Sequence, residues 1–364
     1  MRPNDRQRVL LLAESLVVGG KERQLTLLAR YLPREWDRRV WSLDDGPFAA
    51  VLRAAGVAVD VRRRRYRQDV TPLFDLFWLL RRWRPSVVHS WSGLTSVMVA
   101  LLCPILRIPW VDGSIRKGSV GTKQVARSRV AMALADRVLS NTRAGLEAWG
   151  VPSGKGRVVY NGFDPERLPL ATRTAAPNGP FTVAMVGRMC VAKDFESFLS
   201  AAETLARDSP AGWHFVALGS GPLRSQLIDR ASDLVRSGVV SVPDAGLEVI
   251  PYLRDADAGV LMSNPNEHLE GFSNAIMEYM ACGLPVVCSD GGGNRELVAD
   301  TETGFVIPPF DAPALATKLS WLRNNREVAA RMGSAGRERL LRDFTVEEFV
   351  RRTVAVYEEI LPVV

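Results

Sequence analysis

The spacing of two glutamates, Glu270 and Glu278, is the feature of this chain with the clearest chemical meaning. Glu270 lies just before a predicted helix that begins near Ser273, and Glu278 lies inside that helix. A carboxylate beside a helix start accepts hydrogen bonds from hydroxyl groups, and the free N–H groups of Ser273 and Asn274 favour phosphate. The segment therefore predicts a site for a ligand with phosphate and hydroxyl groups. For the glutamate pair alone, a capping anion and a solvated helix residue are the alternative.

Two cations lie in an earlier loop, where Gly187, Arg188 and Lys193 follow the predicted strand Phe181–Val186 and precede a helix. Glycine permits a tight turn, and the two cations stand next to a helix N-terminus, which itself favours anions. The loop therefore predicts a diphosphate site. Two solvated surface cations are the alternative.

Two glycine turns follow apolar strands in the same way. The run Gly219-Ser220-Gly221-Pro222 opens a helix, and its small residues let a ligand approach the backbone closely. Gly19 and Gly20 join the first strand to the first helix but lack the G-x-G-x-x-G spacing, which argues against a nicotinamide enzyme. A glycine pair below a helix N-terminus still admits a pyrophosphate or an acceptor.

Two polar residues end predicted strands in the first half of the chain. His89 ends one apolar strand and Asp112 holds the analogous position in the next. Such positions face the ligand crevice of a parallel sheet, so both are candidates for contact with a reacting group. A hydrogen-bonded structural histidine is the alternative for His89. We expect His214 and His268 to be structural or surface residues, and no metal cluster is evident.

Length and cysteine usage limit the class of protein. A chain of 364 residues is long enough for two domains. Its four cysteines lack C-x-x-C spacing, so neither a zinc site nor a disulfide framework is indicated, and a reducing cytoplasm fits. No signal-peptide pattern opens the chain, and the longest apolar stretch, Leu94–Ile105, is shorter than a membrane span.

Charge is divided unequally along the chain. Residues 1–175 hold 30 Lys and Arg against 15 Asp and Glu, and the remainder holds 17 against 25. The basic half contains Arg62–Arg65 with Arg67, close to an aromatic segment with Phe74, Phe77, Trp78 and Trp83. This face fits an anionic membrane surface or simply water, and an ordinary packed helix is the alternative for the aromatic segment. Without a recognition motif, we expect no nucleic-acid partner.

Apolar strand-like segments alternate with helical patterns throughout, which predicts an α/β fold with two doubly wound parallel sheets. The strand-like segments are Val9–Ala13, Arg39–Leu43, Val57–Val61, Ser86–Ser90, Pro109–Gly113, Arg137–Ser140, Arg157–Tyr160, Phe181–Val186, His214–Leu218, Val239–Val242, Ala258–Met262 and Val286–Ser289. We expect one domain over 1–167, a breaker-rich linker over 168–180 and a second domain over 181–343. An amphipathic helix in 344–364 is expected to cross back to the first domain.

Taken together, these motifs resemble those of the retaining glycosyltransferases of family 4, which have the GT-B architecture of two Rossmann-like domains facing across a cleft. The matching elements stand in family order and cover almost the whole chain. They are Gly19-Gly20, Asn161-Gly162-Phe163-Asp164, Gly187-Arg188 with Lys193, Gly219-Ser220-Gly221-Pro222, and Glu270 through Asn294. Where many members carry a histidine, this chain has Asp112-Gly113-Ser114, so His89 or Asp112 takes that role, or the reacting centre is contacted differently.

The resemblance implies a nucleotide-sugar donor, such as a UDP- or GDP-sugar, bound to the second domain without a metal or cofactor. Arg188 and Lys193 would hold the diphosphate, Glu278 the ribose and Glu270 the sugar hydroxyls. The implied acceptor is a cell-envelope glycan or a polyprenyl-linked saccharide, reached by a cytoplasmic enzyme at the inner face of the membrane. A GT-B nucleotide-sugar epimerase or hydrolase is the alternative.

Overall fold

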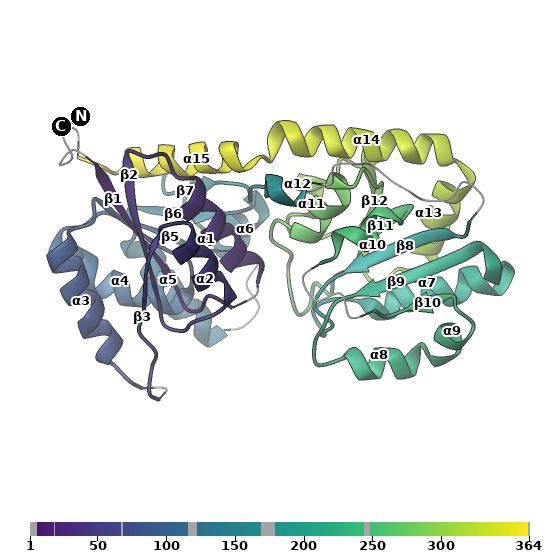
Figure 1. Cartoon of the computed structure of the whole chain (residues 1–364), viewed down its shortest axis with the longest axis horizontal. Helices are drawn as coiled ribbons and strands as arrows, with labels where there is room; N and C mark the ends of the chain where they lie inside the picture. The colour runs from purple at the N-terminus through teal and green to yellow at the C-terminus, as the bar shows by residue number, and fades with distance from the viewer. Residues whose placement is uncertain are drawn as a thin grey trace. The chain divides into compact units, whose positions relative to one another are not determined.

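The computed structural model describes residues 6–17, 19–66, 68–115, 122–168, 179–243 and 248–362, with only the backbone of residues 122–125. The chain forms two compact units (Figure 1). Unit 1 contains the residues up to Gly162 together with those from Val346 onward, and unit 2 contains Phe163–Thr345. Most of the linker predicted over 168–180 lies outside the described residues, as does Arg67.

Unit 1 has a parallel sheet of seven described strands in the order β3-β2-β1-β4-β5-β6-β7. The strands are β1 (Gln7–Ala13), β2 (Trp36–Ser42), β3 (Ala58–Val61), β4 (Val87–Ser90), β5 (Trp110–Ile115), β6 (Arg137–Ser140) and β7 (Gly156–Val158). The helices are α1 (Gly20–Tyr31), α2 (Pro47–Ala54), α3 (Thr71–Trp83), α4 (Gly93–Leu106), α5 (Thr122–Leu134), α6 (Arg143–Trp149) and α15 (Val346–Glu358).

Strand β1 shows why this sheet is apolar on both faces. Successive side chains of a strand point to opposite faces, so Val9 and Leu11 join one core with residues of α1 and α15. Leu10 and Leu12 join the other core, with residues of α3, α4 and α5. Helix α15 packs beside α1, which brings the end of the chain onto the unit where the chain begins.

Unit 2 has a parallel sheet of six described strands in the order β10-β9-β8-β11-β12-β13. The strands are β8 (Phe181–Val186), β9 (Trp213–Leu218), β10 (Val240–Ser241), β11 (Ala258–Leu261), β12 (Val286–Ser289) and β13 (Gly304–Ile307). The helical segments are η1 (Pro165–Arg167), α7 (Phe195–Asp208), η2 (Pro210–Gly212), α8 (Arg224–Arg230), α9 (Ser232–Arg236), α10 (Ile250–Arg254), α11 (Asn274–Ala281), α12 (Asn294–Leu297), α13 (Ala312–Asn324) and α14 (Arg326–Asp343).

The prediction of two doubly wound α/β domains is confirmed, and the differences are local. Strand β13 was not predicted from the sequence, because its four residues follow a turn and make only a short apolar run. The helix predicted to open after the run Gly219–Pro222 is two helices, α8 and α9, with a break at Ala231. Among the described helices, none is both long and apolar enough to cross a membrane.

Candidate functional site

In unit 2, four loops leave the carboxyl ends of β8, β9, β11 and β12 and lead into α7, α8, α11 and α12. Strand order reverses between β8 and β11, because β8 continues to β9 on one side whereas β11 continues to β12 on the other. Ligands of open parallel sheets bind at such a reversal, outside the carboxyl ends of the strands. The topology therefore points to the loops after β8 and β11.

Lys193 and Glu270 meet at this reversal. Lys193 comes from the loop after β8 and donates its Nζ to Glu270 Oε1, which belongs to the loop after β11. Ser263 Oγ donates to the same oxygen at 2.9 Å, and His268 Nε2 lies 3.8 Å from it. The side chains of Lys193 and Glu270 are 15% and 7% exposed, so the pair is largely removed from water.

The environment of Glu270 favours the ionised carboxylate. Burial alone would raise its pKa, but the charges of Lys193 and His268 and the hydrogen bonds from Lys193 and Ser263 outweigh burial and lower the pKa. A carboxylate that stays ionised can accept hydrogen bonds from sugar hydroxyls. The cation beside it can neutralise a phosphate.

Glycines bring the loops after β8 and β9 into direct backbone contact. Gly219 has φ +146°, and a Cβ there would lie 1.9 Å from the carbonyl oxygen of Gly187. Gly221 has φ +157°, and its Cβ would lie 2.3 Å from the carbonyl oxygen of Met189. Two backbone hydrogen bonds join the loops, from Gly187 N to Leu218 O and from Met189 N to Ser220 O. The glycine turns predicted from the sequence therefore serve a close backbone approach.

The N-terminus of α7 differs from the sequence expectation of a free anion site. Asp194 caps this helix, because its Oδ1 accepts a hydrogen bond from Ser197 N at 3.0 Å. A carboxylate at this position already satisfies a helix-end donor. Arg188 is exposed and forms no ion pair in the described part of the chain. The exposed guanidinium of Arg188, rather than the helix end, remains available for an anion.

Helix α11 begins at Asn274, and Ser273 is its N-cap, with Ser273 Oγ accepting from Ile276 N at 3.5 Å. Glu278 lies inside this helix and is only 4% exposed, so the alternative of a solvated helix residue is wrong. Its Oε1 lies 2.7 Å from Nη2 of Arg167, at the end of η1. Glu278 thus has an arginine partner that the sequence did not reveal.

The run of glycines after β12 fixes the backbone of Glu270. Gly292 has φ +58°, and a Cβ there would lie 2.0 Å from the carbonyl oxygen of Glu270. Gly293 N donates to that same oxygen at 2.9 Å. Asn294 follows, fully buried, and its Nδ2 donates to Ser289 O at 2.9 Å. This part of the sequence therefore positions the glutamate.

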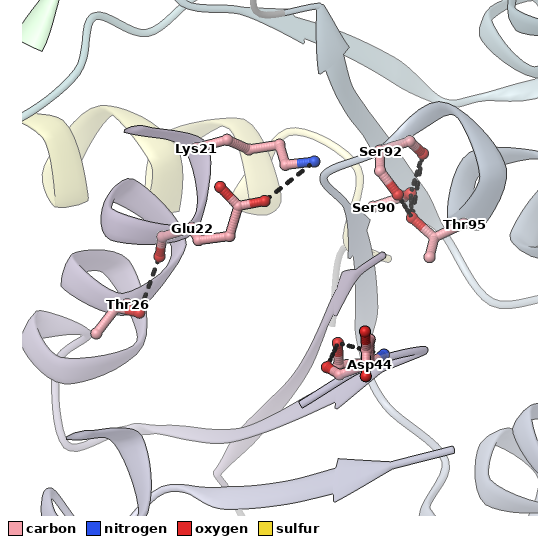
Figure 2. A network of polar contacts seen from close by, with 8 residues as sticks. Lys21, Glu22, Thr26, Asp44, Ser90, Ser92 and Thr95 are labelled. Carbon is pink, nitrogen blue, oxygen red and sulfur yellow. Dashed lines mark hydrogen bonds and ion pairs between the residues drawn. The ribbon is translucent and has the colours of Figure 1, made fainter. Parts of the chain in front are cut away.

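In unit 1 the strand order reverses between β1 and β4, and polar side chains gather at that edge (Figure 2). Gly19 is the N-cap of α1, and Gly20 is its first residue. Glu22 is buried and lies 3.4 Å from Lys21. A Cβ at Gly19 would lie 2.3 Å from Glu22 Oε2, so the glutamate side chain reaches back over the N-cap residue. Sequence reasoning missed Glu22, although its place three residues after the N-cap is that of a capping box.

A chain of buried hydroxyl groups stands on the β4 side of this edge. Thr95 Oγ1 is 2.7 Å from Oγ of both Ser90 and Ser92. Ser96 Oγ donates to Asp112 Oδ1 and lies within hydrogen-bond distance of Ser90 Oγ, each at 2.9 Å. Asp112 is fully buried and also accepts from Ser114 N at 2.9 Å. Asp112 therefore anchors a polar network inside unit 1, and a role in catalysis stays a prediction.

His89 is 1% exposed, and its Nδ1 lies 2.7 Å from the hydroxyl oxygen of Tyr357 on α15. Its ring also lies against Trp91, with centroids 4.9 Å apart. On the other side, a Cβ at Gly113 would lie 2.3 Å from His89 Nε2. This geometry matches the alternative of a hydrogen-bonded structural histidine, and the catalytic role stays a prediction. In the described part of the chain, no group of three or more His, Cys, Asp or Glu could hold a metal ion.

Two family models match this chain. The model for glycosyl transferases group 1 matches residues 170–339, and the model for glycosyltransferase family 4 matches residues 18–167. Together they span every described strand of both units except β1, which precedes residue 18.

Known proteins with related sequences include a glycogen synthase and a glycosyltransferase of colanic acid biosynthesis. A glycogen synthase of Mycobacterium tuberculosis is 29% identical over 295 residues, which cover 76% of this chain and 69% of the relative. A putative colanic acid biosynthesis glycosyltransferase, WcaL of Salmonella typhimurium, is 28% identical over 220 residues. That match covers 59% of this chain and 54% of the relative, so the chain spans about half the length of WcaL.

Among solved structures, HepE of Anabaena in complex with UDP and glucose is similar over 98% of this chain and 100% of that chain. The TM-score is 0.81 at 21% sequence identity. This likeness concerns the fold, and it confirms the GT-B class of two Rossmann-like units.

Proposed function

We propose that this chain is a retaining enzyme that uses a nucleotide-sugar donor. The chain belongs to the glycosyltransferases: its second half matches the group 1 model, and its first half matches the family 4 model. The acceptor is a cell-envelope glycan or a lipid-linked saccharide. The observation that carries the donor proposal is the Lys193–Glu270 pair at the strand reversal of unit 2. That the HepE structure holds UDP and glucose supports a donor of this kind.

In this proposal each side chain of unit 2 has a defined task. Arg188 and Lys193 neutralise the diphosphate, and Glu270 accepts hydrogen bonds from the sugar hydroxyls. Glu278 accepts hydrogen bonds from the ribose. Gly219 and Gly221 let the loop after β9 lie directly against the loop after β8, because side chains at these positions would collide with that loop.

Catalysis then consists of stabilising the charge that develops on the leaving diphosphate. The bond between the sugar anomeric carbon and the phosphate oxygen breaks, and a bond to the acceptor oxygen forms on the same face. The acceptor proton passes to the leaving phosphate, so no side chain acts as nucleophile, and the proposal needs no metal or cofactor.

The acceptor proposal includes docking of unit 1 on an anionic lipid surface. Helices α3, α4 and α5 cover one face of the sheet, and each exposes two large apolar side chains one helical turn apart. These pairs are Phe74 and Trp78, Leu101 and Ile105, and Val130 and Leu134, all more than half exposed. Such spacing places each pair on one side of its helix.

Charge around these apolar pairs favours an anionic partner. Helices α4 and α5 contain no Asp or Glu. Exposed arginines flank these helices along the chain, at Arg62–Arg65 before α3, Arg81 and Arg82 at its end, and Arg127 and Arg129 in α5. Arg62, Arg63 and Arg64 form exposed ion pairs with Asp75, Asp44 and Glu14. Apolar side chains that enter the headgroup region beside arginines bind anionic membranes through both area and charge.

Vesicle binding tests this docking. We expect binding to vesicles that contain phosphatidylglycerol but not to pure phosphatidylcholine, with a loss for Arg62–Arg65→Ser and for Trp78→Ser with Ile105→Ser. Leu341→Ser, an exposed leucine of α14 in unit 2, is the matched control and should bind as wild type. Unchanged binding in the unit 1 variants would remove this part of the proposal.

The donor is tested by thermal shift with UDP-, GDP-, ADP- and dTDP-sugars, because a ligand that binds only the native state raises the melting temperature. A radiolabelled form of the sugar that binds is then incubated with and without lipid-linked acceptor. Transfer only with acceptor supports the proposal. Product without acceptor would indicate the epimerase or hydrolase instead, and no shift with any nucleotide sugar would overturn the donor assignment.

A further inference from the structure

Arg167 contacts the one carboxylate of the proposed donor site that has no part in the Lys193 network. Nη2 of Arg167 lies 2.7 Å from Oε1 of Glu278. The side chain of Glu278 is 6% exposed and that of Arg167 is 20% exposed. A buried carboxylate needs a charged partner, because a buried charge without one destabilises the fold. Removal of one partner of a buried ion pair therefore lowers the free energy of unfolding by much more than the intact pair adds to it.

Further positive charge lies near the C-terminal turn of α11. Burial raises the pKa of the Cys282 thiol to about 12, with a contribution from Glu278, whereas Arg337, Arg254 and Arg167 act in the opposite direction. Arg337 lies at this turn, because its Nη1 donates to the carbonyl oxygen of Ala281. Of the three arginines, Arg167 has the ion pair to Glu278 at short distance.

We propose that Arg167 is a positioning residue for donor binding, which holds Glu278 Oε1 in place so that this carboxylate is oriented toward the ribose hydroxyls. The charge-assisted contact at 2.7 Å fixes the place of Glu278 Oε1. The Nε of Arg167 is buried and has no hydrogen-bond partner in the described residues. The inference rests on the proposed function, because it assumes that Glu278 meets a ribose.

The test compares a ribonucleoside diphosphate with its 2′,3′-dideoxy form. UDP, GDP, ADP and dTDP are first screened on the wild-type protein by calorimetry, and the tightest of UDP, GDP and ADP is kept with its dideoxy counterpart. We expect wild type to prefer the ribose form. Arg167→Gln should bind that form about tenfold more weakly, the size of one hydrogen bond to a charged group, and the dideoxy form almost unchanged.

Variants separate positioning from general effects. Arg167→Lys should restore part of the ribose preference, and Arg167→Gln should add little in a Glu278→Gln background. Arg254→Gln removes the same charge near α11 without an ion pair to Glu278 in the described part of the chain, and it should keep the preference. If folded Arg167→Gln discriminates ribose from dideoxyribose as wild type does, the inference is wrong. If wild type binds no nucleoside diphosphate, the proposed function itself fails.

Discussion

The ammonium group of Lys193 donates a hydrogen bond to the buried carboxylate of Glu270, at the point where the strand order of the second sheet reverses. The two residues come from loops after neighbouring strands, β8 and β11, so the fold itself brings the charges together. The antiparallel bridge between Lys193 and Ser263 joins the same loops through their backbones. The pair is thus both a candidate ligand site and a connection between the two loops that form it.

Replacing Lys193 by Met should destabilise unit 2, because it leaves the Glu270 carboxylate buried without its cation. The expected loss in the free energy of unfolding is about 3 kcal/mol, at the low end for a broken buried pair because Ser263 and His268 remain. Urea unfolding measures it. The double variant Lys193→Met with Glu270→Gln should recover part of the loss, and an equal loss in both variants would contradict the pairing.

The same substitutions should separate binding from turnover. Lys193→Ala should weaken the binding of a nucleotide sugar, because a cation beside the diphosphate is lost. Glu270→Ala should reduce turnover more than binding, because its hydrogen bonds to the sugar tighten as the sugar departs from phosphate. Steady-state kinetics with the donor identified by thermal shift measures both. Full turnover in Glu270→Ala would show that Glu270 does not bind the sugar.

Acid should weaken the fold through Glu270. Its pKa is lowered in the folded state, against about 4.3 in an unfolded chain, so its stabilising effect is complete above that value. The effect is lost as pH falls through the lower, folded pKa. We therefore expect the free energy of unfolding to fall less steeply below about pH 5 in Glu270→Gln than in wild type.

Glu348 provides a control for the acid effect. Hydrogen bonds from Arg351 and Arg352 lower its pKa to about 2, but Arg351 is 67% exposed. Salt screens exposed ion pairs. The difference between Glu348→Gln and wild type in the acid dependence of the free energy of unfolding should therefore vanish at about 0.5 M salt. The difference for Glu270→Gln should persist. Loss of both differences in salt would show that Glu270 is more accessible than its burial indicates.

The sequence predicts the strands well where they are continuous apolar runs buried on both faces, as in Val9–Ala13 and Val286–Ser289. It also predicts which loops contain the candidate site, because glycines and charged residues directly follow those strands. It does not predict partners that lie far apart in the chain. The contact of Arg167 with Glu278, and that of Tyr357 with His89, arise from packing of η1 and α15 and leave no local pattern.

Gly219→Ala should disrupt the contact between the loops after β8 and β9. A Cβ there would collide with the carbonyl oxygen of Gly187, and φ +146° adds strain of about 1–3 kcal/mol for any other residue. We expect a lower melting temperature together with weaker nucleotide-sugar binding. Gly154→Ala, with open space around its Cα, should be neutral or slightly stabilised. A stable Gly219→Ala variant with intact binding would show that the loops separate without consequence.

Tyr357→Phe distinguishes a structural His89 from a catalytic one. Both side chains are buried, and the variant removes the hydroxyl that lies 2.7 Å from His89 Nδ1. An unpaired buried nitrogen costs about 1–3 kcal/mol, so the free energy of unfolding should fall by that amount. If His89 only holds α15, then His89→Asn should lower stability similarly, and the double variant should fall little further.

The kinetic comparison completes the argument for His89. A purely structural histidine leaves kcat and its pH profile unchanged in the folded fraction of both variants. A catalytic histidine would change the pH profile when replaced by Asn, and Tyr357→Phe would shift it through the lost hydrogen bond. Because the ring is 1% exposed and lies against Trp91 and Tyr357, we expect unchanged profiles. A kcat that falls at least about tenfold in a stable His89→Asn variant would show that His89 takes part in catalysis.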